Sequence, residues 1–132
     1  MNAVLLFAGQ GAQKVGMGKD LAEAYPTVRA LFDQADAALG HTLTNVMFEG
    51  PMEELTRTSH CQPALYAHGL AILEVLKEKV PSLNITATAG LSLGEFTAHA
   101  AAGTFDFSTG LYLVFQRGSF MEEACLNTQG AM

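Results

Sequence analysis

The sequence predicts an α/β layered fold built around a parallel β-sheet. Residues 3–7 and 83–89 are short runs of apolar and β-branched residues, which are typical of buried strands. Segments with helical spacing lie between these runs and after the second one. Parallel strands need long crossover connections, so this order of strand, helices, strand and helices favours a parallel sheet.

The composition is that of a single compact domain. The chain has 132 residues, of which 49% are hydrophobic and 15% are charged, enough for one core and too few for two typical domains. Its net charge of −6 gives no basic surface for nucleic acid, and no segment approaches the roughly 20 apolar residues of a membrane span. We therefore expect no nucleic-acid or membrane partner. We also expect no cofactor and no metal ion.

The two cysteines indicate the compartment. Cys61 and Cys125 are too few for a disulfide scaffold, and the first residues, MNAVLLF, lack the basic segment of a secretory leader. Free thiols in a reducing cytoplasm are the expectation, with a redox pair as the alternative.

The first strand, at residues 3–7, is a continuous apolar run, which predicts burial on both faces of the sheet. Residues 9–18 contain four glycines, so we expect a loop whose backbone comes close to another group. Pro26 then opens a helix that Gly40 ends. The apolar stripe of this helix consists of Val28, Leu31, Phe32, Ala35 and Leu39.

Prolines mark the next boundaries. Pro51 opens a short amphipathic helix. Helical spacing begins again at Pro63 and continues until Pro81 forbids it. Residues 83–89 are rich in β-branched side chains, and they predict the second strand.

Two helices complete the chain. The first covers residues 93–102 and stops at Gly103. Asp106 or Ser108 caps the second, which is predicted to run to about Cys125.

The segment GLSLG, residues 90–94, fits the Gly-x-Ser-x-Gly pattern of a nucleophile elbow. A predicted strand precedes it and a predicted helix follows, which is the context in which a strained turn exposes a serine. Ser92 is therefore a candidate nucleophile, and the N–H of Leu93 at the helix start is a candidate oxyanion donor. The alternative is that Gly90, Ser92 and Gly94 only permit close packing of the helix on the strand.

Arg117 interrupts the apolar stripe of the last helix, where a guanidinium needs a partner because it cannot lose its charge. An ion pair with an aspartate or glutamate would satisfy it, and so would a carboxylate that arrives with a substrate. The stripe residues around it are Leu113, Phe120, Met121 and Ala124.

Four segments, in order and at matching spacings, resemble the malonyl-CoA:acyl-carrier-protein transacylases of fatty-acid biosynthesis. They are FAGQGAQ at 7–13, CQPAL at 61–65, GLSLGE at 90–95 and QRGSFM at 116–121. Two positions depart from the family pattern. Ala8 replaces the usual proline of the glycine-rich loop, and Leu91 replaces a histidine that is common before the serine.

The resemblance implies a role for each matching residue. Ser92 would attack the malonyl thioester and carry the malonyl group as an ester. The backbone N–H groups of Gln10 and Leu93 would bind the oxyanion. Arg117 would bind the free malonyl carboxylate, and Gln62 would lie beside the substrate. The malonyl group would then pass to the phosphopantetheine thiol of acyl carrier protein in a ping-pong reaction, with malonyl-CoA as substrate.

The resemblance also implies a domain division, with a three-layer core like that of the α/β hydrolases. Residues 1–125 would form the amino-terminal part of the large α/β acyltransferase subdomain. Residues 126–132 would begin the small ferredoxin-like subdomain. The chain would thus be an amino-terminal fragment of a protein that is a monomer at full length.

The family takes its catalytic base from a histidine much further along the chain. His41, His60 and His68 precede the serine and match no such position. His99 lies seven residues after Ser92 on the same predicted helix, about 10 Å along its axis, which is too far for a base. We therefore expect this chain alone to be inactive, and unstable because an edge of its sheet would be exposed.

Three alternatives belong beside this interpretation. An α/β-type serine hydrolase or thioesterase shares the elbow but needs neither the GQGAQ segment nor Arg117. A noncatalytic remnant that serves as an interaction module is a second. A polyketide carrier domain is the alternative acceptor for a malonyl transferase.

Overall fold

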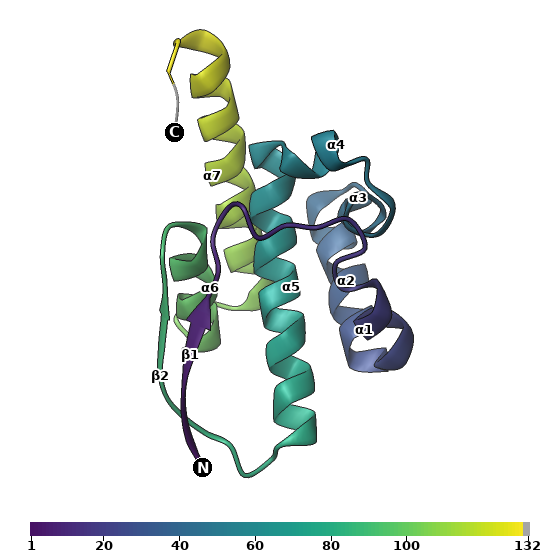
Figure 1. Cartoon of the computed structure of the whole chain (residues 1–132), viewed down its shortest axis with the longest axis vertical. Helices are drawn as coiled ribbons and strands as arrows, with labels where there is room; N and C mark the ends of the chain where they lie inside the picture. Colours follow the sequence, from purple (N-terminus) through teal and green to yellow (C-terminus); the bar gives the residue numbers. More distant parts are fainter. Residues whose placement is uncertain (131–132) are drawn as a thin grey trace.

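The computed structural model describes residues 1–130 and has two strands and seven helices in this part of the chain. The strands are β1 (Asn2–Phe7) and β2 (Asn84–Gly90). The helices are α1 (Lys19–Ala24), α2 (Pro26–Leu39), α3 (Leu43–Glu49), α4 (Met52–Thr56), α5 (Thr58–Lys79), α6 (Leu93–Ala101) and α7 (Phe107–Asn127). Figure 1 shows α5 as a long central helix, with α1, α2 and α3 on one side and the strands with α6 on the other.

The two strands are parallel, as predicted. Their register runs from Asn2 opposite Asn84 to Phe7 opposite Gly90, with one irregularity just after Ala3. Because parallel strands end at the same edge of a sheet, the loop after β1 and the turn after β2 leave the sheet side by side. The predicted α/β fold class is confirmed, and this shared edge is where the candidate nucleophile lies.

The prediction that the first strand is buried on both faces is wrong for this chain. Side chains along β1 alternate between half-buried and exposed, and Val4 and Leu6 are 58% and 79% exposed. The face that carries Leu5 packs against the core, whereas nothing in residues 1–130 covers the opposite face. A parallel sheet is normally covered on both faces, which is why a continuous apolar run predicts double burial. The run itself does not show which elements cover each face.

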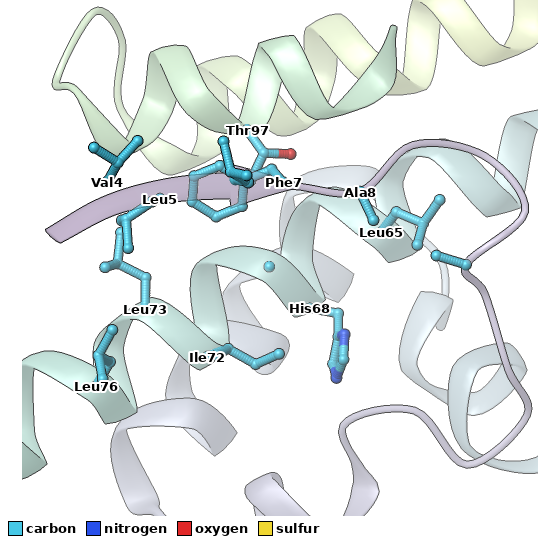
Figure 2. Close-up of a pocket in the computed structure, with 13 residues that line it drawn as sticks. Val4, Leu5, Phe7, Ala8, Leu65, His68, Ile72, Leu73, Leu76 and Thr97 are labelled. Carbon is cyan, nitrogen blue, oxygen red and sulfur yellow. The ribbon is translucent and has the colours of Figure 1, made fainter. Parts of the chain in front are cut away.

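An apolar groove of about 410 Å³ separates β1 from α5. Figure 2 shows Leu5 of β1 and Leu73 of α5 approaching each other across it, with Thr97 of α6 above. The hydroxyl of Thr97 is buried there without a hydrogen-bond partner in the described residues. His68 lines the groove as well, and burial lowers its pKa.

Helix α5 is the centre of the helical layer and contacts α2, α3, α4, α6 and α7. The prediction that it begins at Pro63 is wrong, because the helix begins five residues earlier at Thr58. Its first turn closes when the N–H groups of His60 and Cys61 donate to the carbonyl of Arg57. Those bonds form without the N–H that Pro63 lacks, so the proline lies within the helix instead of at its start.

Two short helices, α1 and α3, were not predicted from the sequence. Each is six or seven residues long, which is too short for a clear periodic pattern. The start of α3 depends on a contact from another helix, because the carboxylate of Asp36 on α2 accepts hydrogen bonds from the N–H and hydroxyl of Thr44. A cap supplied from α2 leaves no local signal in the sequence of α3.

The last helix begins as predicted at Asp106, whose carboxylate accepts a hydrogen bond of 2.8 Å from the N–H of Thr109. Ser108, the alternative cap, instead accepts a hydrogen bond from the Gln34 amide. The helix ends at Asn127, two residues beyond the predicted end, and Thr128 is extended. Of the segment 126–132 that was assigned to a second subdomain, residues 131–132 lie outside the described residues. That assignment stays a prediction.

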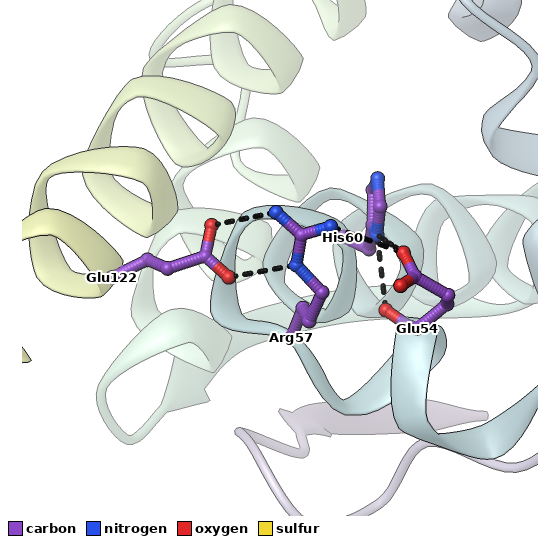
Figure 3. A network of polar contacts seen from close by, with 4 residues as sticks. All are labelled: Glu54, Arg57, His60 and Glu122. Carbon is purple, nitrogen blue, oxygen red and sulfur yellow. Dashed lines mark hydrogen bonds and ion pairs between the residues drawn. The ribbon is translucent and has the colours of Figure 1, made fainter. Parts of the chain in front are cut away.

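An ion-pair network holds α7 against the α4–α5 junction (Figure 3). The guanidinium of Arg57 donates to both carboxylate oxygens of Glu122 on α7, at 3.0 and 3.4 Å, and to Glu54 on α4 at 3.1 Å. His60 joins the network because its Nδ1 donates to the carbonyl oxygen of Glu54 at 3.0 Å.

None of the helices in residues 1–130 is long and apolar enough to cross a membrane.

We predict that Arg57→Ala lowers stability slightly at neutral pH and that the loss disappears in acid. The hydrogen bonds from Arg57 hold the pKa of Glu122 below its usual value of 4.5. A carboxyl group with a lowered folded pKa stabilises the fold above its unfolded pKa, and that stabilisation fades as pH falls through the folded pKa. Urea midpoints of the two proteins should therefore differ modestly at pH 7 and converge as the pH falls through the lowered pKa of Glu122.

The matched control is Lys77→Ala, which removes an exposed ion pair with Glu74 within one helix. That variant should match the original protein at neutral and at low pH, within the scatter expected of exposed pairs. A difference between Arg57→Ala and the original protein that persists unchanged at low pH would contradict the assignment to Glu122.

Candidate active site

Ser92 occupies the turn between β2 and α6 in a strained backbone conformation. Its φ is 56° and its ψ is −119°, and it is the one non-glycine residue with positive φ in residues 1–130. Such a conformation costs about 1–3 kcal/mol in a non-glycine residue and persists only where the surrounding structure enforces it. The side chain of Ser92 is exposed at the shared edge of the two strands.

Two flanking glycines enforce this turn by allowing very close packing. A Cβ atom on Gly94 would lie 2.2 Å from the carbonyl oxygen of Phe7, and one on Gly90 would lie 2.1 Å from the carbonyl carbon of Gly94. The first turn of α6 therefore rests directly on the end of β1. Close packing explains the two glycines, as the alternative interpretation held, but it does not require a serine with positive φ between them.

The glycine-rich loop after β1 passes next to this turn. A Cβ atom on Gly9 would lie 2.9 Å from the carbonyl oxygen of Leu91 and 4.0 Å from the Cβ of Ser92. The segments of Gln10 and Leu93, the two expected oxyanion donors, are therefore neighbours. Neither of their N–H groups donates to an acceptor within the part of the chain that the structure describes.

Arg117 of α7 contacts the serine directly. Its Nη2 donates to the Oγ of Ser92 at 3.1 Å, and its Nη1 donates to the Oε1 of Gln62 at 2.8 Å. No aspartate or glutamate among residues 1–130 forms an ion pair with it, so the structural ion pair considered above is not found. A half-buried cation thus faces the candidate nucleophile without a carboxylate partner.

Gln62 of α5 lies behind the guanidinium. It is only 1% exposed, and its Nε2 donates to the Sδ of Met121 on α7 at 3.4 Å. The amide is therefore held at both ends by α7 side chains. In this structure Gln62 contacts Arg117 and not the hydroxyl of Ser92.

Two residues that the sequence reasoning missed help to place Arg117. The Cζ of Arg117 lies 5.4 Å from the ring centroid of Phe96 on α6. Gly118 lets α7 pack tightly on α5, because a Cβ atom there would lie 2.5 Å from the carbonyl oxygen of Thr58. The signals were present, since Phe96 follows Ser92 by four helical positions and a glycine within a helix often marks close packing.

No histidine within residues 1–130 forms a hydrogen bond with Ser92. The Nδ1 of His99 pairs with the hydroxyl of Thr104 at 3.2 Å, and its Nε2 lies 3.9 Å from Glu95. The rings of His41 and His60 lie 5.9 Å apart, the Nδ1 of His60 pairs with the carbonyl oxygen of Glu54, and His68 lines the groove. A base for Ser92 is therefore not found in this part of the chain.

The two cysteines are free thiols, as expected, so the redox pair is not found. Burial raises the pKa of Cys61 to about 11, which keeps it a neutral thiol at neutral pH and unsuited to act as a nucleophile. Within residues 1–130 no group of three or more metal-ligating side chains could hold a metal ion.

The comparisons with known proteins point to one family. The model of the acyl transferase domain matches residues 4–132. The malonyl CoA-acyl carrier protein transacylase of Bacillus subtilis (strain 168) is 47% identical over 127 residues, which cover 96% of this chain and 39% of that protein.

Solved structures give the same result. The acyl-carrier-protein-S-malonyltransferase of Bartonella henselae matches with a TM-score of 0.88 and 40% identity, over 94% of this chain and 40% of that one. A malonyl-transacylase solved in complex with its type II polyketide acyl-carrier protein matches with a TM-score of 0.86 and 43% identity, over 92% of this chain and 39% of that one. The chain spans about two fifths of the length of these relatives.

We predict that Gly94→Ala destabilises the fold by about 3 kcal/mol, because its Cβ would have to displace a backbone oxygen and not a flexible side chain. The matched control is Gly130→Ala, where an added Cβ meets nothing within 4 Å. Urea unfolding followed by circular dichroism checks both variants. Equal stability of Gly94→Ala and Gly130→Ala would show that the start of α6 does not depend on its contact with β1.

Proposed function

Because the chain belongs to the acyl transferase domain family, we propose that it carries the nucleophile and the carboxylate-binding residue of a malonyl transferase. The observation that supports this most is the pairing of Ser92 with an arginine that has no carboxylate partner. The Nη2 of Arg117 is 3.1 Å from the Oγ of Ser92. A serine hydrolase has no use for a fixed cation at this distance from its nucleophile, so that alternative is not favoured.

The charge and donors of Arg117 suit a carboxylate ligand. A guanidinium has five N–H donors, and the structure uses one on Nη1 and one on Nη2 within residues 1–130. Three donors remain for an incoming carboxylate, enough for a bidentate pair.

The short distance between Ser92 and Arg117 suits a short dicarboxylate. In malonyl thioesters one methylene separates the thioester carbonyl carbon from the carboxylate carbon. A carboxylate bound to Arg117 would therefore place the thioester carbonyl close to the Oγ of Ser92, the geometry that a nucleophilic attack needs. An acetyl group has no carboxylate and would gain nothing from Arg117.

In the proposed reaction the Oγ of Ser92 attacks the thioester carbonyl of malonyl-CoA and its proton goes to a base. The C–S bond breaks, the coenzyme A thiolate takes up the proton, and malonyl remains as an ester on the serine. The N–H groups of Leu93 and Gln10 would stabilise the oxyanion. Residues 1–130 bring no base to Ser92, so we propose that this chain alone does not turn over.

We propose acyl carrier protein as the acceptor, through its phosphopantetheine thiol, in fatty-acid biosynthesis. One similar structure contains a type II polyketide acyl-carrier protein, so a polyketide carrier is the second candidate acceptor. A cytoplasmic location and a monomeric state at full length are part of the same proposal. So is the division at residue 125 between a large and a small subdomain.

The proposed site predicts how Arg117→Ala changes acyl selectivity. The assay uses a chimera in which this chain replaces the matching part of the Bacillus subtilis relative. Transfer is measured from malonyl-CoA and from acetyl-CoA to acyl carrier protein. Arg117→Ala should lower kcat/KM for malonyl by about 100-fold, because a charge-assisted bidentate contact is lost, and should leave acetyl transfer within a few-fold.

Two variants serve as controls in the same chimera. Ser92→Ala should abolish transfer and the malonyl ester that mass spectrometry detects on the 86–103 region. Arg29→Ala removes an exposed arginine paired with Asp33 on α2 and should change neither activity. If Arg117→Ala lowers kcat/KM equally for malonyl and acetyl, the proposed carboxylate contact is wrong.

A further inference from the structure

We propose that Phe96 is a positioning residue that keeps the guanidinium plane of Arg117 oriented toward Ser92. The expected effect on malonyl binding rests on the proposed function. The contact between Phe96 and Arg117 does not, because it lies within this chain. The elbow serine, Ser92, and Phe96 one turn later on α6 would then act together on one cation.

The contacts of Arg117 are of two kinds. Gln62 and Ser92 accept hydrogen bonds from opposite nitrogens, at 2.8 and 3.1 Å, and both act in the guanidinium plane. Phe96 is different, because the Cζ of Arg117 lies 5.4 Å from the centroid of its ring. An aromatic ring at this distance attracts the cation and limits its rotation out of the plane.

This contact becomes more important when a substrate arrives. A carboxylate on the free N–H groups of Arg117 adds a third in-plane acceptor beside Gln62 and Ser92. In-plane hydrogen bonds alone leave the guanidinium free to rotate out of its plane. The ring of Phe96 would restrict this rotation and so keep the other donors directed toward the substrate carboxylate.

Phe96 is itself well fixed. It is half-buried and packs against the hydrophobic core. It also lies on α6 one turn after Ser92, and the start of α6 rests on β1 through Gly94. A movement of Phe96 relative to Ser92 would therefore require α6 to deform. The contact transmits the position of the nucleophile to the cation across the α6–α7 interface.

The test compares Phe96→Leu, which keeps an apolar side chain but loses the ring, with Phe96→Tyr, which keeps the ring. Nitrogen-15 NMR of the chimera with the Bacillus subtilis remainder would measure rotation about the Nε–Cζ bond of Arg117, and a titration with sodium malonate would measure affinity. We expect faster rotation and 3- to 10-fold weaker malonate binding in Phe96→Leu, roughly the size of a partly exposed cation–π contact. Phe96→Tyr should retain both properties.

Phe48→Leu is the matched control, because its ring contacts Phe32 and not Arg117. It should change neither rotation nor affinity. If Phe96→Leu fails to fold, the original protein still provides a test, since a ring whose face lies under Arg117 shifts the Arg117 side-chain proton resonances upfield. Absence of that shift overturns the proposal, and so does unchanged rotation of Arg117 in a folded Phe96→Leu.

The same titration separates this inference from the proposed function. If malonate binds the original protein and Arg117→Ala equally, the carboxylate site is wrong, whereas faster rotation in Phe96→Leu still supports the hold on Arg117. If Arg117→Ala loses malonate binding and Phe96→Leu retains full affinity and slow rotation, the carboxylate site stands and Phe96 has no positioning role.

Discussion

The contact between the first turn of α6 and the end of β1 determines the rest of the site. Gly94 has no side chain, so its backbone lies against the carbonyl of Phe7 at a distance that no Cβ atom could share. The turn before it must then be sharp, and Ser92 takes up a left-handed φ of 56°. The strain at the serine is a consequence of this packing, and the packing energy of the surrounding core offsets it.

Helix α5 provides the second half of the arrangement. It carries Gln62, and its first turn is the surface against which Gly118 lets α7 pack. These contacts bring Arg117 to the serine from a helix that begins fifteen residues after it. Three segments that are distant in sequence therefore meet at one point, and each is held there by backbone packing and not by a long flexible side chain. Such support from rigid elements is what keeps the guanidinium of Arg117 and the hydroxyl of Ser92 within hydrogen-bond distance.

Features that depend on neighbouring residues in the chain could be predicted from the sequence, whereas features that depend on long-range contacts could not. The elbow could be predicted because glycine, serine and the change from strand to helix are adjacent in the chain. Arg117 could be identified as an anomaly because a cation on an apolar stripe needs a partner, although the sequence did not show whether that partner was a carboxylate. The cap that Asp36 supplies to α3, the early start of α5 before Pro63 and the ring of Phe96 on Arg117 all depend on neighbours from other elements. The exposure of Val4 and Leu6 could not be predicted either, because an apolar run does not reveal how many layers cover a strand.

We propose that this chain presents a preformed cation beside a serine nucleophile for a short dicarboxylate. A crystal structure of the chimera with the Bacillus subtilis remainder, grown with malonate, tests it most directly. We predict one malonate carboxylate bound by two nitrogens of Arg117, with Gln62 still hydrogen-bonded to the guanidinium and the second carboxylate within reach of the Oγ of Ser92. An Arg117 side chain turned away to pair with an aspartate or glutamate of the protein, with malonate bound elsewhere or not at all, would contradict it.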